Sequence, residues 1–387
     1  MSHGTPATAP SRHGRPSLNP VSADTPNAET PSVAVPASLT VIAGQVDERL
    51  EAFLGPELDR WAQLDGDLVD PMSQVRQLVR AGGKRLRPAF CHWGYVAAGG
   101  EATGSGAVTA IVDIGAAFEL MHAFALFHDD VMDDADERRG AVATHRLFAD
   151  RHAASGWAGE SRRFGEGVAI LVGDLAFVYS DMLLTGAHPE VWRVWNELRV
   201  ELNVGQLLDI VGSVRADRTI ERAERVCRYK SGKYTVERPL HMGAAAAGMP
   251  VESPTGLALS AYGLPLGEAF QMRDDVMGAF GDAAVTGKPV GGDLREGKPT
   301  PLLARAYVAA DAAQREVLDG VGTPTMDDAE VHRIQQVIVE TGALTALEAE
   351  IEHRVGAAVA ALADPAIDRA AVGELTALAA YVTGRAN

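Results

Sequence analysis

The sequence predicts an all-α protein, a single large bundle of about ten or more helices. Apolar residues recur at helical spacing from Leu39 onward, and alternating runs of β-branched residues, which are typical of strands, are nearly absent. Glycine and proline interrupt the pattern and leave short connections. At 387 residues, 47% of them hydrophobic, the chain is long enough to bury a sizeable core.

The N-terminal segment differs from the rest of the chain. Residues 1–40 contain seven of the twenty prolines, with Ser, Thr and Ala between them. Such a segment cannot bury enough apolar surface to offset the entropy cost of ordering it. We expect residues 1–40 to be a disordered leader and residues 41–387 to form the helical domain. The leader has no continuous apolar stretch and therefore does not resemble a secretory signal, so we expect a cytoplasmic protein.

The expected helices follow in chain order, each identified by its apolar face. Breaks are expected at Gly82-Gly83, Gly99-Gly100, Gly156, Pro189, Pro250–Pro254 and Gly291-Gly292. The apolar faces between them are Val75, Leu78 and Val79; residues 107–128; Leu171, Leu175 and Val178; Leu264, Leu266 and Phe270; and Val331, Ile334 and Ile338. Asp113 and Glu119 interrupt residues 107–128, so we expect no membrane span.

Charge and cysteine content exclude several classes of function. The formal net charge of −17 argues against nucleic acid as a partner, because no basic surplus is available to neutralise phosphates. Cys91 and Cys227 form no CxxC pair and no zinc-like spacing with histidine, and we expect two buried free thiols. An acidic enzyme that binds an anionic substrate must concentrate its few cations and recruit metal ions.

Two aspartate pairs at helical spacing indicate such a metal site. Asp129 and Asp133 share one helix face, as do Asp130 and Asp134, and like charges four residues apart need a counter-charge. Mg²⁺ is the economical choice, because it takes one or two carboxylates together with phosphate oxygens and water. A solvated acidic helix end is the alternative for this motif alone. A second motif, FQMRDD with Asp274 and Asp275, follows another apolar helix, and facing helices are how bundles build metal sites.

Short basic clusters complete the pattern expected for a diphosphate site. Lys84, Arg85 and Arg87 follow a Gly-Gly break where a phosphate can approach closely. The other candidates are Arg138 and Arg139 after the first motif, Lys230 and Lys233 beside Ser231, and Lys288 and Lys298 after the second motif. Surface lysines remain an alternative for the last two pairs, and simple charge balance for the two arginines.

Seven motifs in order resemble the trans-isoprenyl diphosphate synthases, also called the polyprenyl synthetase family, over roughly residues 75–305. They are GGKRLRP from Gly82, HDDVMDD from His128 with RRG from Arg138, GDLAF from Gly173, GQLLD from Gly205, KSG from Lys230, FQMRDD from Phe270 and GKPVGGDLREGKPT from Gly287. The last motif looks like the branch common in actinobacteria. The resemblance implies an isoprenoid synthase bundle that pairs as a homodimer.

The resemblance also implies roles for individual residues. Asp129, Asp133 and Asp274 would bind Mg²⁺, three ions per site, with Asp130 and Asp275 as indirect partners. Isopentenyl diphosphate would bind to Lys84, Arg87, His122 and Arg139. The allylic diphosphate (dimethylallyl, geranyl or farnesyl) would bind to the metals and to Arg138, Lys230, Lys288 and Lys298. Oxygens near Ser231 and Gln271 would stabilise the allylic cation. A core histidine is the alternative for His122.

The chain departs from the family pattern at two positions. Ser231 replaces the more common Thr and keeps the hydroxyl, whereas Gly278 replaces the usual third Asp of the second motif. Asp282 is the candidate to substitute for that carboxylate.

Product length is expected to depend on the helix that precedes Asp129. Phe124, Ala125 and Met121 precede it by five, four and eight residues, and five helical residues rise about 7.5 Å. In the family, an aromatic residue at this position indicates geranylgeranyl diphosphate as product. The alternative that Phe124 only packs in the core stays open. The alternatives are a farnesyl or longer product, or a class I terpene cyclase.

Overall fold

The computed structural model describes residue 1 and residues 34–101, 107–215, 217–281, 291–323 and 325–384. The predicted leader falls mostly on residues 2–33, outside the described residues, as do Lys288 and Asp282. The all-α prediction is confirmed. The helices of the first half are α1 (Ala37–Ala62), η1 (Gly66–Leu68), α2 (Val69–Arg80), α3 (Leu86–Ala97), α4 (Ala107–Met132), α5 (Thr144–Ser155), α6 (Ser161–Leu183) and α7 (Pro189–Arg215).

The second half continues the pattern. Its helices are α8 (Ile220–Val226), the π-helix η2 (Cys227–Glu237), α9 (Arg238–Ala246), α10 (Pro254–Phe280), α12 (Gly292–Glu296), α13 (Pro301–Ala309), α14 (Ala312–Leu318), α15 (Asp328–Glu340), α16 (Ala343–Ala361) and α17 (Arg369–Thr383). Each predicted glycine or proline break falls at a helix boundary. Gly156, for example, ends α5 with φ 64°, a backbone conformation that glycine adopts at little cost.

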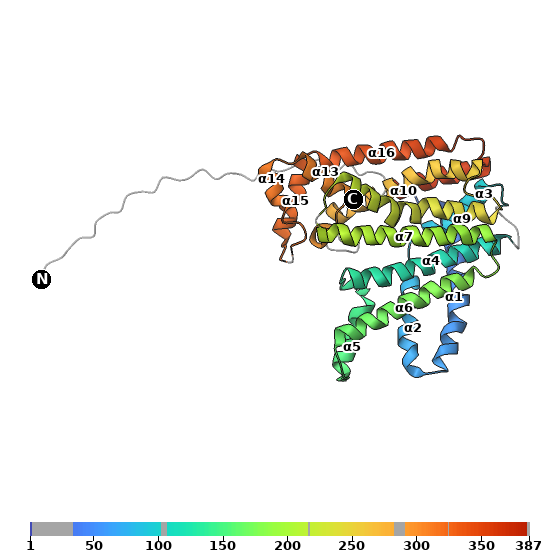
Figure 1. Ribbon diagram of the computed structural model, residues 1–387, viewed down its shortest axis with the longest axis horizontal. Coiled ribbons are helices and arrows are strands. Elements are labelled where there is room, and N and C mark those ends of the chain that lie inside the picture. The colour runs from blue at the N-terminus through green and yellow to red at the C-terminus, as the bar shows by residue number, and fades with distance from the viewer. Residues whose placement is uncertain (2–33, 102–106, 216, 282–290, 324, 385–387) are drawn as a thin grey trace. The chain divides into compact units, whose positions relative to one another are not determined.

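Two hydrophobic clusters hold the helices together. One includes Phe90, Phe118, Trp195 and Tyr262 from α3, α4, α7 and α10, and the other joins the end of α10 to α13, α15 and α16. The most extensive pairings are α4 with α6, α10 with η2 and α16, α3 with α9, and α5 with α6, followed by α7 with η2. In Figure 1, α7, α9, α10 and α4 run nearly side by side through the middle of this body. The pairing of α7 and α10 with η2 places the functional helices around one another.

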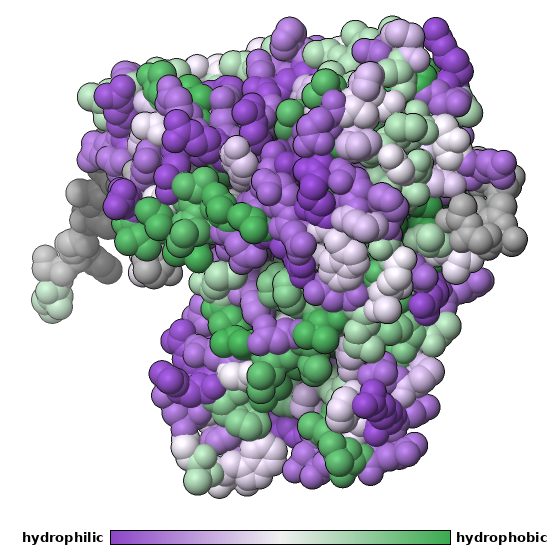
Figure 2. All heavy atoms as spheres, turned by 45° about the vertical axis from the view of Figure 1, so that its right-hand side comes forward, coloured by the Kyte–Doolittle hydropathy of each residue, from purple (hydrophilic) through white to green (hydrophobic). Residues whose placement is uncertain are grey.

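Several large hydrophobic side chains stay on the surface. On α6 they include Phe164, Leu171 and Val178, seven residues apart, and on α7 they include Val200 and Leu207. Figure 2 shows hydrophobic residues gathered in groups on the lower part of the face in view, where Figure 1 places α1, α2, α5 and α6. Seven-residue spacing puts the α6 side chains on one face of the helix.

Helix α4 is the one described helix long and apolar enough to cross a membrane by length and composition, over Thr109–Met132. Of its most apolar window, 61% is buried inside the protein, as in a core helix. Its two acidic interruptions are paired, Asp113 with Arg49 at 2.5 Å and Glu119 with the buried Arg85. The absence of a membrane span stays a prediction.

Candidate active site

A cavity of about 660 Å³ opens among α3, α4, α7, η2 and α10. Most of the predicted site residues line it, namely Lys84, Arg87, His122, Ala125, Asp129, Arg138, Arg139, Lys230, Ser231, Gln271, Asp274 and Lys298. Asp133, Phe124 and Met121 are not among its lining residues. The cavity therefore brings together both aspartate motifs and the basic clusters, which come from distant parts of the sequence.

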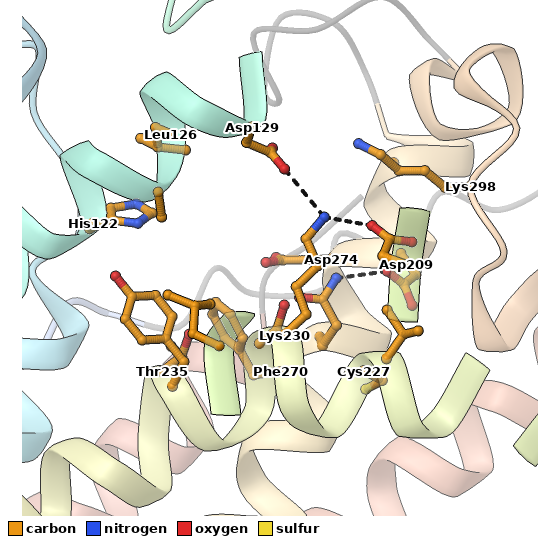
Figure 3. Close-up of a pocket in the computed structure, with 18 of the residues that line it drawn as sticks. His122, Leu126, Asp129, Asp209, Cys227, Lys230, Thr235, Phe270, Asp274 and Lys298 are labelled. Atoms are coloured by element: carbon orange, nitrogen blue, oxygen red, sulfur yellow. Dashed lines mark hydrogen bonds and ion pairs between the residues drawn. The ribbon is translucent and has the colours of Figure 1, made fainter. Parts of the chain in front are cut away.

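Asp129 and Lys230 form the centre of the first acidic group (Figure 3). The Lys230 Nζ atom lies 3.3 Å from Asp129 Oδ1 and 2.6 Å from Asp209 Oδ2, and Gln206 donates to the same Asp129 oxygen at 3.1 Å. Burial disfavours the charge of Lys230, but Asp129 and Asp209 outweigh it and raise the lysine's pKa. Burial likewise opposes ionisation of Asp129, but the charges of Lys230 and Lys298 outweigh it and lower the pKa of Asp129. Both groups are thus charged at neutral pH.

The remaining acids of the first motif have separate partners. Arg138 donates to Asp130 from Nε at 2.6 Å and lies 3.6 Å from Asp129, and Lys298 lies 3.6 Å from Asp133 Oδ2. Burial, followed by the charge of Asp129, raises the pKa of Asp133. Carboxylates held together against their mutual repulsion favour an added cation.

The second motif faces the first across the cavity. Asp274 and Asp275 lie on α10, and Gln271 donates from Nε2 to Asp275 Oδ1 at 2.8 Å. The other oxygen of Asp275 is buried without a hydrogen-bond partner. Burial raises the pKa of Asp275 well above its ordinary value, and the charge of Asp293 adds to the shift. An unpaired buried carboxylate oxygen is a natural place for a bound cation or water.

A short hairpin separates the two predicted arginines, a feature that the sequence reading missed. Strands β1 (Glu137–Arg138) and β2 (Ala141–Val142) pair antiparallel, and Arg139 and Gly140 between them have φ of 54° and 75°, as expected for a two-residue turn. Arg138 is directed to Asp129 and Asp130, whereas Arg139 donates to the Leu78 carbonyl at 2.9 Å and to that of Gly82. The turn thus assigns adjacent arginines to opposite ends of the cavity.

The second cationic group lies beside the Gly82-Gly83 loop. Arg87 stacks over the Tyr234 ring at 4.2 Å and donates to Thr235 Oγ1 at 3.1 Å, while its Nε has no partner. His122 Nδ1 is also buried without a partner. Burial, then the charges of Arg87 and Arg139, hold the pKa of His122 well below its ordinary value, so its imidazole is neutral. This group can bind an anion separate from the one beside Asp129.

The π-helix η2 carries Lys230 and Ser231 into the cavity. Side chains on Gly205 of α7 or Gly267 of α10 would overlap the backbone at Lys230 and Gly232, so glycine permits both helices to approach η2 closely. Lys233, by contrast, pairs with Glu201 and does not line the cavity. Of the two predicted lysines, Lys230 therefore lines the cavity and Lys233 does not.

The residues present fit Mg²⁺ bound together with a diphosphate. In the described part of the chain, no three acidic, histidine or cysteine side chains converge closely enough to enclose an ion by themselves. That arrangement suits Mg²⁺, which takes one or two carboxylates and completes its shell with phosphate oxygens and water. Asp129 on one side and Asp274 with Asp275 on the other line the cavity and leave room between them, and Asp133 lies four residues beyond Asp129.

The predicted chain-length residues lie next to the cavity. Ala125 lines it, whereas Phe124 packs against Phe177 of α6 at 4.8 Å and against His128 at 4.7 Å, and Met121 is fully buried. Neither Phe124 nor Phe177 lines the cavity.

Sequence reasoning missed further lining residues. Gln206 and Asp209 belong to the quoted GQLLD motif but were assigned no role, although a polar pair at i, i+3 on an apolar helix was a usable signal. Tyr234, Thr235 and Asp293 also line the cavity. Asp293 belongs to the quoted GKPVGGDLREGKPT motif but was assigned no role, whereas no local pattern distinguishes Tyr234 and Thr235.

Comparison with known proteins agrees with this geometry. A family model described as polyprenyl synthetase matches residues 71–340. The chain is 31% identical to a geranylfarnesyl diphosphate synthase of Aeropyrum pernix over 318 residues, which is 80% of this chain and 92% of that protein. It is also 31% identical to a geranylgeranyl diphosphate synthase of Mycobacterium tuberculosis over 288 residues, 73% of this chain and 75% of that protein.

A solved structure is similar as well. It is a geranylgeranyl pyrophosphate synthase from Corynebacterium glutamicum, complexed with isoprenyl diphosphate and magnesium. The TM-score is 0.84 at 36% identity, with 89% of this chain and 99% of that chain covered.

Proposed function

The chain belongs to the polyprenyl synthetase family and is an isoprenyl diphosphate synthase, and from this premise we propose that it releases geranylgeranyl diphosphate. The substrates in this proposal are isopentenyl diphosphate and the allylic dimethylallyl, geranyl and farnesyl diphosphates, joined in trans. The observation that carries this proposal is that one cavity is lined by residues of both acidic motifs and of two separate cationic groups. The test is incubation of the protein with Mg²⁺, labelled isopentenyl diphosphate and farnesyl diphosphate, with products resolved by length.

The two cationic groups support two diphosphate subsites. Arg138, Lys230 and Lys298 lie beside the acidic motifs and would hold the allylic diphosphate. Lys84, Arg87, His122 and Arg139 would hold isopentenyl diphosphate. A class I cyclase binds only one diphosphate, so the second group argues against that alternative. Formation of a cyclic hydrocarbon from an allylic diphosphate alone would favour the cyclase.

We propose that three Mg²⁺ ions bind with the allylic diphosphate, held by Asp129, Asp133 and Asp274. Bound Mg²⁺ supplies Lewis-acid stabilisation of the departing diphosphate. Lys230 and Arg138 add positive charge where negative charge develops as the allylic C–O bond breaks and its electron pair leaves with the diphosphate. The isopentenyl double bond then attacks the allylic carbon, and a proton passes to the departing diphosphate.

The lining of the cavity suits a cationic intermediate. Leu126, Leu202 and Phe270 are apolar and help exclude water, which would otherwise capture the cation. The hydrogen bond from Gln271 Nε2 to Asp275 orients the amide. Ser231 and the Gln271 amide oxygen would stabilise the cation without reacting with it. These roles leave no need for a nucleophilic side chain.

Product length is the finer part of the proposal, because relatives of equal identity make C25 and C20 products by name. Phe124 is partly buried and packs on Phe177, and its neighbour in the sequence, Ala125, lines the cavity. We propose that this aromatic pair stops elongation at geranylgeranyl diphosphate. If the product were farnesyl diphosphate, the residue that stops elongation would lie closer to Asp129. A longer product would require Phe124 and Phe177 to separate.

We also propose a cytoplasmic homodimer. The exposed apolar stripe on α6, formed by Phe164, Leu171 and Val178, supports a partner there, because surfaces of this kind are usually covered. Cys91 and Cys227 are both buried and free, in keeping with a reducing compartment.

A further inference from the structure

The second aspartate motif of this chain contains two carboxylates, whereas the first contains four. Residues one helical turn apart on α10 share a face, so a side chain at position 278 would project beside that of Asp274. Position 278 is glycine, which offers no ligand atom. The first motif, by contrast, has both Asp129 and Asp133 at this spacing.

The space beside Gly278 is occupied by a carboxylate from elsewhere in the chain. A Cβ atom built on Gly278 would overlap the side chain of Asp293, whose Oδ2, Cγ and Oδ1 are its three nearest neighbours. Asp293 is in the first turn of α12 and, like Gly278, lines the cavity. The two residues are therefore sterically complementary in this arrangement, because a side chain at position 278 would displace this carboxylate.

The turn that carries Asp293 is held in place. Gly291, with φ 72°, begins α12 in a conformation that favours glycine, and the Lys298 amide donates to the Asp293 carbonyl at 3.1 Å. Lys298 in turn lies 3.6 Å from Asp133, just past the end of α4. The α12 turn thus holds the Asp293 side chain at the cavity wall, next to α10.

A second and independent feature points to a ligand at this place. Asp275 is 5% exposed, lines the cavity, and has one carboxylate oxygen, Oδ2, without a hydrogen-bond partner. A buried carboxylate oxygen that lacks a protein donor is satisfied by a cation or by water that a cation holds. The unpaired Oδ2 atom of Asp275 therefore marks this part of the cavity, where Asp274 and Asp293 also lie, as a place for a cation.

We propose that Asp293 supplies the third carboxylate of the second aspartate motif, in the space that Gly278 leaves, and binds Mg²⁺ directly or through one water on the α10 side. This inference rests on the proposed function, because the ion binds together with an allylic diphosphate. It differs from the sequence-based expectation, which assigned the role to Asp282, a residue outside the described part of the chain.

Calorimetric titration of Mg²⁺ into the full chain, saturated with an unreactive thiolo analogue of farnesyl diphosphate, tests the inference. The isosteric Asp293→Asn should weaken Mg²⁺ binding about 10- to 100-fold, the range for loss of a supporting metal ligand. The double variant Gly278→Asp/Asp293→Gly moves the carboxylate back to α10 and should recover Mg²⁺ affinity to within a few fold. Asp328→Asn removes an exposed acid that pairs with Arg295 and is the matched control.

Three results would overturn the inference. One is Mg²⁺ affinity unchanged within about twofold in Asp293→Asn, well short of the loss expected for a ligand. Another is an equal loss of analogue affinity in the absence of metal, since that would mean that Asp293 only orients Lys298. Labelled isopentenyl incorporation by the wild-type preparation separates failure of this inference from failure of the proposed function. A folded double variant that does not recover Mg²⁺ affinity would also contradict it.

Discussion

The Lys230 Nζ atom lies 3.3 Å from Asp129 Oδ1, which joins the π-helix η2 to the first aspartate motif across 101 residues of sequence. Asp209 holds the same ammonium from the other side at 2.6 Å. The lysine is thereby positioned at the wall where the allylic diphosphate is proposed to bind. Substitutions at Lys230 therefore test the site most directly.

Lys230→Met should lower the turnover number about 10²- to 10³-fold, the loss typical when one donor to a developing anion is removed. Lys230→Arg keeps the charge and should recover part of the rate. Single-turnover transfer of labelled isopentenyl diphosphate measures the effect, and melting temperature checks the fold. A Lys230→Met enzyme with normal turnover would contradict the role.

The hairpin predicts that its two arginines serve different substrates. Loss of a charge-assisted hydrogen bond costs about 1.5–3 kcal/mol, so Arg139→Gln should raise the KM for isopentenyl diphosphate about 10- to 150-fold. Arg138→Gln should raise mainly the KM for the allylic diphosphate. Initial rates with each substrate varied in turn measure both constants, and a common effect of the two variants on both would refute the separation.

Phe124→Ala should lengthen the product by at least one isoprene unit, because it removes the ring that packs on Phe177 at 4.8 Å. Phe53→Ala is the matched control, since Phe53 packs edge-to-face on Tyr179 of the same helix and does not line the cavity. Chromatography of the dephosphorylated products reads the chain length. An unchanged product from Phe124→Ala would exclude the aromatic stop.

The burial of His241 predicts that the free energy of unfolding falls in mild acid. Burial, then the charge of Arg238, lowers its pKa to about 4 in the folded protein from an ordinary value of 6.5. The unfolded chain binds the proton more readily between these values, so the stabilisation is present above pH 6.5 and is lost as pH falls toward 4. The difference amounts to about 3 kcal/mol at most.

Urea unfolding at pH 7 and pH 5 measures this effect. The wild-type free energy of unfolding should fall with pH more steeply than that of His241→Gln, which keeps a polar side chain near Ser260 and the Gly256 carbonyl. Parallel pH profiles for the two proteins would show that His241 is not the responsible group.

The exposed stripe on α6 predicts that a single charge will separate the proposed dimer. Leu171→Glu should give a monomer by light scattering, because a buried unpaired carboxylate at an interface is costly. Val41→Glu, on the exposed face of α1, is the matched control and should leave the mass unchanged. A wild-type protein that is already monomeric would contradict the dimer itself.

The sequence by itself determined the all-α class, the helix boundaries at glycine and proline, and the two aspartate motifs with their basic clusters. These features are local, since helical periodicity and backbone conformation depend on residues a few positions apart. The order of seven motifs was enough to indicate the family, which the family model then confirmed.

Only the tertiary structure decided which side chains meet. Lys230 reaches Asp129 while Lys233 pairs with Glu201, although the two lysines lie only three residues apart. A positive φ at Arg139 separates it from Arg138, and the gap at Gly278 is filled by Asp293 from α12. Such contacts depend on how closely helices approach and on which face each presents, and side chains distant in sequence carry no local signal of that packing.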